Sequence, residues 1–269
     1  MKLTVPLWLG HLFLVGLFLF LSFLFAGVAW NFLPFLPVLA LGIWRSPRPI
    51  GHILRLLPSG ALKDRGVLRI VRALFFLSLG LGGWIFVAAF IGTGVQVLRP
   101  LPQEYAGFFE EVLTKLPLIT AVLVVGVGAP IFEELLCRGL IAGDLLEEYS
   151  PVVALSFSAL VFGFLHFNPW QGIPAFFTGI VLGVVYSRSK ALLYPIWGHG
   201  IYNLGILGLS RLDFDGASYS QPTLQDLAFT GPGALLGLGI FLFGTRRFLR
   251  AVTDPKENLL LEGLEKNGL

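Results

Sequence analysis

Two glutamates and an arginine lie inside an otherwise apolar stretch of this chain, and they limit what that stretch can become. The stretch begins near Leu116 and carries the segment EELLCR at residues 133–138. A run of that length predicts a membrane-spanning helix, where ionisable groups are costly and by default mark a function. On a helix Glu134 and Arg138 share a face and are expected to pair, whereas Glu133 lies about 100° further round. We therefore predict that one carboxylate is structural and that the other acts inside the bundle.

The rest of the chain has the composition of a polytopic membrane protein. Of its 269 residues, 55% are hydrophobic and only 13% are charged, which is far from the usual balance of soluble proteins. We predict an all-α transmembrane helix bundle with about seven or eight spans. The apolar run Val5–Trp30 is too long for a cleaved signal peptide and is expected to be a retained first span. Residues 31–44 contain Pro34 and Pro37, so they form either a second, broken span or a shallow segment.

Charge and turn signals divide the chain into three regions. Residues 1–115 hold the N-terminal spans, residues 116–210 form a core, and residues 211–269 hold an outer loop, a last span and a tail. The segment 45–72 has seven Lys and Arg against one Asp, so the positive-inside rule places it in the cytoplasm. Its apolar side chains predict an amphipathic helix on the membrane surface; these are Ile53, Leu54, Leu56 and Leu57. Because spans flank this segment, nucleic acid is not expected as its partner. We expect the same side for the basic groups at 188–190 and 246–250 and for the C-terminal tail. The acidic turn at 144–148 also falls on that side, where the positive-inside rule does not favour it.

Two further polar pairs repeat the four-residue spacing of a helix face. Phe162 and His166 lie in one apolar segment, and His199 and Asn203 lie in a later one. At the rise of an α-helix, Glu133 and His166 lie about 21 and 22 Å from the inner ends of their helices, and His199 about 12–16 Å. These side chains are therefore expected to share one layer within the membrane, where a carboxylate, two imidazoles and an amide can bind or activate a water.

The order EExxxR, FxxxH and HxxxN on successive hydrophobic segments resembles the CPBP intramembrane protease family, which includes the type II CAAX prenyl endopeptidases. Arg138-Gly139 and the segment FGFLHFNPWQ at 162–171 fit as well, and the resemblance covers roughly residues 116–209. It implies that Glu133 and His166 activate a water and that His199 and Asn203 stabilise an oxyanion. Prenylated CAAX proteins are the substrates of the best-known members, while other members resemble bacteriocin-immunity factors.

A carboxylate with two neutral imidazoles is also a common zinc donor set. Glu133, His166 and His199 are thus candidate ligands for Zn²⁺, although the chain has no HExxH motif. A metal-free scheme with the same residues stays open. The single cysteine, Cys137, excludes an intramolecular disulfide. A thiol nucleophile is disfavoured there because an apolar helix opposes the thiolate.

We predict an intramembrane endopeptidase that cleaves a membrane-associated protein or peptide, with the lipid bilayer as its setting. The predicted catalytic residues are Glu133, Glu134, Arg138, His166, His199 and Asn203. Two alternatives use the same polar set. A non-catalytic scaffold or an immunity-like protein would keep it for packing. A transporter would use it as a proton relay, but the paired broken helices of a transporter are not found.

Overall fold

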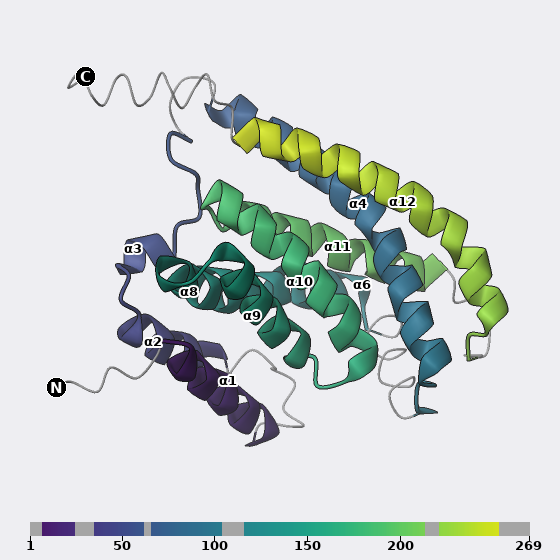
Figure 1. The fold of residues 1–269 in the computed structure, drawn as a ribbon, viewed down its shortest axis with the longest axis horizontal. Helices are drawn as coiled ribbons and strands as arrows, with labels where there is room; N and C mark the ends of the chain where they lie inside the picture. Colours follow the sequence, from purple (N-terminus) through teal and green to yellow (C-terminus); the bar gives the residue numbers. More distant parts are fainter. Residues whose placement is uncertain (1–6, 25–34, 62–65, 104–115, 213–220, 253–269) are drawn as a thin grey trace.

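The computed structural model describes residues 7–24, 35–61, 66–103, 116–212 and 221–252, and within these ranges every regular element is a helix. This confirms the all-α fold class. The elements outside the core region are α1 (Leu7–Leu24), α2 (Phe35–Arg45), α3 (Ile50–Ile53), α4 (Gly66–Leu98) and α12 (Leu224–Val252) (Figure 1). The core region holds one long helix followed by α9 (Pro151–Phe164), α10 (Pro169–Ser189) and α11 (Leu193–Leu212).

Four helices in the described ranges are long and apolar enough to cross a membrane: Gly66–Leu98, Leu118–Glu148, Pro169–Ser189 and Leu224–Val252. Three shorter apolar helices lie at Trp8–Leu17, Leu36–Arg45 and Pro151–Phe164. Together with α11 these segments agree with the predicted transmembrane helix bundle. The 11-residue helix α2 is too short to cross a bilayer core alone. Pro37 is accommodated there because it lies in the first turn.

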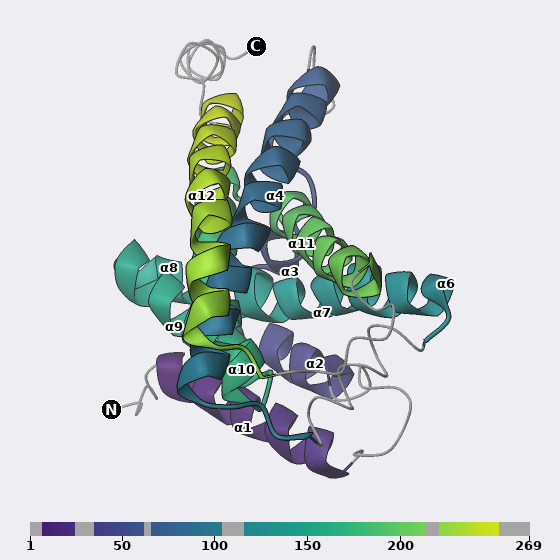
Figure 2. The same cartoon turned by 90° about the vertical axis from the view of Figure 1, so that its right-hand side faces the viewer.

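Helices α4 and α12 lie side by side along their length (Figures 1 and 2). Glycines make this approach possible. A Cβ added at Gly83 would lie 2.4 Å from the carbonyl oxygen of Gly237, and one added at Gly244 would lie 2.4 Å from the backbone nitrogen of Gly80. Gly80 and Gly83 thus serve the close packing that the sequence predicted, since small residues let backbones approach in membrane helix pairs. Gly82 faces open space instead.

The prediction of an amphipathic surface helix in the basic segment is wrong. Among the described residues between α2 and α4, only 50–53 form a short helix, and the helix that starts at Gly66 is already α4. Pro49 precedes the short helix and Gly60 adopts a φ of 74°, so prolines and a turn interrupt the pattern. The segment packs on the core: Ile53 is buried, and the carbonyls of Arg55 and Leu56 accept hydrogen bonds from the backbone at the start of α11.

The acidic turn at 144–148 is not a simple exception to the charge rule, because Asp144 is fully buried. Its Oδ1 accepts hydrogen bonds from Arg48 Nε at 2.6 Å and from Ser46 Oγ at 2.7 Å. His11 Nε2 of α1 lies 3.5 Å from Asp144 Oδ2, so this histidine also contacts the carboxylate. This cluster ties α1 and the end of α2 to the long core helix. Arg48 is therefore bound inside the protein and is not a free charge of the basic loop.

Candidate active site

The long helix Leu118–Glu148 that carries the two glutamates changes its winding along its length. It runs through α6 (Leu118–Ala121), the π-helical segment η2 (Val122–Gly128), α7 (Ala129–Glu134), a second π-helical segment η3 (Leu135–Ala142) and α8 (Gly143–Glu148). Figure 2 shows α7 crossing the middle of the bundle beside α11. Glu133 and Glu134 are the last two residues of α7, the short α-helical part between the two π-helical segments. Such segments occur often at functional sites.

A proline explains one polar contact of the site. In η2 the N–H of Ala129 bonds to the carbonyl of Val124, five residues back. The next residue is Pro130, which has no N–H, so the carbonyl of Val125 lacks the donor that this winding would supply. The side-chain amide of Asn203 donates to that carbonyl at 2.8 Å. Asn203 thus replaces a backbone donor, and the second N–H of its amide stays available.

The predicted ion pair within the helix is confirmed. Arg138 Nη1 donates to Glu134 Oε1 at 2.8 Å, and both side chains are completely buried. Arg138 Nη2 donates to the carbonyl of Gly179 on α10 at 2.7 Å. The guanidinium carbon also lies 4.7 Å from the ring centroid of Phe162. Arg138 therefore balances the charge of Glu134 and at the same time ties the helix to α9 and α10.

His199 lies between the two glutamates. Its Nδ1 is 2.9 Å from Glu134 Oε1, so this nitrogen carries the hydrogen and donates it to the carboxylate. Its Nε2 lies 3.9 Å from Glu133 Oε2. The Glu133 side chain keeps 18% of its surface exposed, yet Oε2 is buried and has no hydrogen-bond partner among the described residues. Glu134 and His199 are thus held in place, and Glu133 presents an uncommitted oxygen.

His166 lies in the turn just after α9, and not within the helix as the sequence predicted. Its Nδ1 donates to the carbonyl of Phe162 at 2.9 Å, which leaves Nε2 facing away from that bond. The Phe162 ring lies edge to face with both imidazoles, with centroid distances of 5.3 Å to His166 and 5.3 Å to His199. Phe162 therefore packs between the two histidines. No hydrogen bond or ion pair within the described ranges joins His166 to Glu133.

The three candidate zinc ligands do not form a ready donor set. In the part of the chain that the structure describes, no group of three or more His, Cys, Asp or Glu side chains is arranged to hold a metal ion. One nitrogen of His199 is already bonded to Glu134, and His166 is separated from it by the Phe162 ring. Zinc binding by Glu133, His166 and His199 therefore stays a prediction.

Sequence reasoning missed three contacts that shape the site. Gly179 supplies a carbonyl to Arg138, Pro130 frees the carbonyl that Asn203 binds, and Ser158 donates to the carbonyl of Cys137 at 2.7 Å. Of these three, only Pro130 could have been noticed in the sequence, because a proline three residues before Glu133 leaves one backbone carbonyl of the helix without a donor. Cys137 is completely buried in the hydrophobic core, which agrees with the argument against a thiol nucleophile.

Comparison with known proteins finds a family match over the region that holds this site. Residues 115–205 match the family described as "Type II CAAX prenyl endopeptidase Rce1-like". That range includes all six predicted catalytic residues, and the match confirms the resemblance noted in the sequence. The chain is also 29% identical over 160 residues to "Putative membrane peptidase YdiL" of Bacillus subtilis (strain 168). The aligned part spans 56% of this chain and 62% of that relative. No solved structure shows a significant match. Together with the apolar helices, these similarities identify an integral membrane protein.

Proposed function

We propose, from the match of residues 115–205 to the type II CAAX prenyl endopeptidase family, that this chain is an intramembrane endopeptidase in which Glu133 activates a water. The observation that carries the proposal is the pairing of an uncommitted Glu133 Oε2 with His199 Nε2 at 3.9 Å. A separation above hydrogen-bond length between two polar atoms is suited to a bridging water. Because His199 Nδ1 donates to Glu134, the neutral ring offers Nε2 as an acceptor. Glu133 Oε2 and His199 Nε2 would each accept one hydrogen of the same water, and its lone pairs would face the substrate.

The reaction then follows the usual course of amide hydrolysis. Glu133 Oε2 takes a proton from the water, and the water oxygen bonds to the carbonyl carbon of the scissile peptide. The carbonyl oxygen becomes an oxyanion, to which the second N–H of the Asn203 amide would donate. Glu133 returns the proton to the amide nitrogen, the C–N bond breaks, and the tetrahedral intermediate collapses. The resemblance also gives His166 a part in water activation, which we retain as a hypothesis.

Two buried residues, Glu134 and Arg138, would support this chemistry without taking part in it, and Phe162 would pack between the two histidines. Glu134 holds the tautomer and orientation of His199 through the 2.9 Å contact. Arg138 neutralises Glu134 inside the apolar bundle, so that Glu133 faces a balanced pair and not a second free negative charge.

The proposed substrate is a membrane-associated protein or peptide, with prenylated CAAX chains as the first class to test. Its peptide would reach Glu133 from the cytoplasmic side or laterally from the lipid. This orientation follows the predicted cytoplasmic position of the basic groups at 188–190 and 246–250. The predicted cytoplasmic tail lies outside the described residues.

The test compares cleavage of a farnesylated CAAX peptide and the same peptide without the lipid by wild type, Glu133→Gln and Glu147→Gln. Glu147 is exposed at the end of the same helix and gives a control with the same chemical change. We expect Glu133→Gln to lose cleavage by a factor of about 10²–10⁴, the usual contribution of a general base, while Glu147→Gln keeps it. Equal cleavage by all three proteins would refute the proposal. Cleavage of neither peptide by folded wild type would favour a scaffold.

A further inference from the structure

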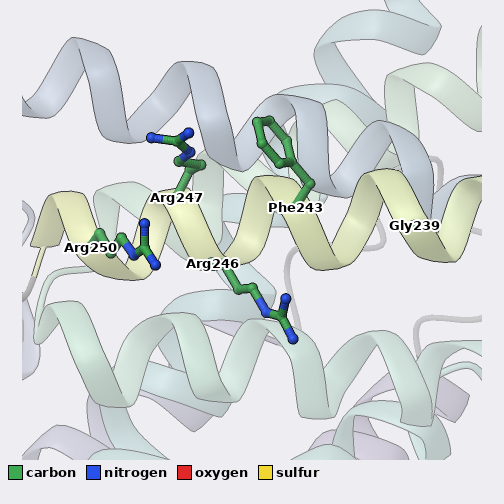
Figure 3. A pocket seen from close by; sticks show the side chains of 5 residues that line it. All are labelled: Gly239, Phe243, Arg246, Arg247 and Arg250. Carbon is green, nitrogen blue, oxygen red and sulfur yellow. The ribbon is translucent and has the colours of Figure 1, made fainter.

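A short stripe of α12 combines three arginines with an apolar hollow (Figure 3). A hollow of about 300 Å³ is lined by Gly239, Phe243, Arg246, Arg247 and Arg250. At about 100° per residue these five positions fall within an arc of about 100° on one side of the helix. The apolar part of the stripe precedes the arginines, and α12 is one of the helices able to cross a membrane. The arginines therefore lie where the hydrocarbon layer gives way to the headgroup layer.

The charges of this stripe are not balanced by the protein in the described ranges. Arg246, Arg247 and Arg250 form none of the ion pairs found there. The guanidinium of Arg247 lies 5.4 Å from the ring centroid of Phe243 and 6.0 Å from that of Phe76. Arg72 of α4 lies 6.0 Å from the same Phe76 ring, so a fourth cation is close by. Arg246 and Arg250 are four residues apart on the helix, a spacing at which like charges destabilise one another.

The hollow itself is made by a missing side chain. Gly239 has no heavy atom within 4 Å of the position that its Cβ would take, so its face of α12 is open. The exposed ring of Phe243 lies beside that opening. The C-terminal end of a helix stabilises a basic residue in its last turn, which accounts for Arg250. It does not account for an apolar hollow directly below three arginines.

We propose that this stripe binds one anionic phospholipid of the adjacent leaflet. Arg246 and Arg250, four residues apart on α12, would bind the phosphate, because guanidinium groups match phosphate oxygens in geometry. Arg247 stays stacked on Phe76 and Phe243 and adds charge. An acyl chain would lie against Phe243 in the hollow over Gly239. The headgroup and the chain thus contact different parts of one stripe.

The test measures binding of short-chain phosphatidylglycerol, phosphatidylcholine and inorganic phosphate to the full chain in neutral detergent, by native mass spectrometry. We expect Arg246→Gln with Arg250→Gln to weaken phosphatidylglycerol binding about 25-fold, from the usual attraction of a basic side chain to an anionic surface. The matched control is Arg188→Gln with Lys190→Gln, which removes the same charge from another exposed turn and should leave binding unchanged. Equal losses in both pairs would show unspecific charge attraction and overturn the site.

A second variant tests the hollow without changing charge. In Gly239→Leu the new Cβ meets no heavy atom within 4 Å, so the helix should fold, and the rest of the leucine side chain extends into the hollow. We expect weaker phosphatidylglycerol binding, by about fourfold for each methylene contact displaced. Gly82→Leu, at an equally open position on α4, is the control and should have no effect. Unchanged binding in Gly239→Leu, or inorganic phosphate binding as tightly as the lipid, would overturn the lipid as the occupant.

Discussion

Removing the Asn203 amide should cost stability only as long as Pro130 is present. In wild type, Asn203 donates to the Val125 carbonyl that the proline leaves without a backbone donor. Asn203→Ala leaves this carbonyl without a hydrogen-bond donor in apolar surroundings, which should lower the free energy of unfolding by about 1–3 kcal/mol. For a chain of this size that corresponds to a fall in melting temperature of about 2–12 °C.

Pro130→Ala supplies the missing N–H five residues after Val125, which is the spacing that η2 already uses between Ala129 and Val124. In this background the carbonyl has a second possible donor. Asn203→Ala should then cost less than about 0.5 kcal/mol, and the two substitutions should be non-additive by the difference, at least about 0.5 kcal/mol and up to about 3 kcal/mol. Thermal unfolding of the four proteins in detergent measures this coupling without relying on any enzyme activity.

A second proline gives the control for this cycle. Pro174 lies inside α10, and Pro174→Ala combined with Asn203→Ala should be additive within about 0.5 kcal/mol. If Asn203→Ala costs the same with and without Pro130, the amide does not act as the replacement donor for the Val125 carbonyl, and this role of Asn203 is refuted. Cleavage assays add a second readout, because the oxyanion role of Asn203 should be lost in both backgrounds.

Three further outcomes follow from the site. Arg138→Met leaves Glu134 buried without its cation and should lower the stability by about 3–5 kcal/mol; an unchanged melting temperature would contradict the buried pair. Cys137→Ala should keep the cleavage rate, since a thiol has no part in the proposed reaction, and loss of kcat in a folded variant would contradict the Glu133 scheme. Elemental analysis of wild type and of His166→Ala with His199→Ala tests the zinc prediction: about one zinc per chain, lost in the double variant, would establish it, and active metal-free protein would exclude it.

The sequence predicted what depends on spacing within one helix. The apolar runs predicted the helical bundle, and the four-residue spacing predicted that Glu134 and Arg138 would pair. Both follow from helix geometry alone. The rotation of one helix against another does not follow from it. Nothing in the FxxxH and HxxxN patterns indicates that His199 contacts the two glutamates while His166 turns away beside Phe162.

Contacts between segments that are distant along the chain could not be predicted from the sequence either. Arg48 was counted with the basic loop, and Asp144 with an acidic turn, because each was judged by its neighbours along the chain. The structure joins them across 96 residues at 2.6 Å. A charge count treats every ionisable side chain as facing water, and it is wrong wherever two of them meet inside the protein. The unexpected acidic turn was the only sign that this had happened.

The irregular winding of the core helix shows how Glu133 can be oriented from a distance. Winding that departs from the α-helix frees carbonyl groups, and in a membrane the protein itself must supply their donors. Side chains from other elements do so in both π-helical segments: Asn203 donates to Val125 in η2, Ser158 donates to Cys137 in η3, and Arg48 donates to Gly139 and Leu140. Glu133 lies on the six-residue α7 between these two segments. Its direction is therefore fixed from both ends by α11, α9 and the chain after α2, so a substitution far from the glutamates can move the carboxylate that we propose as the base.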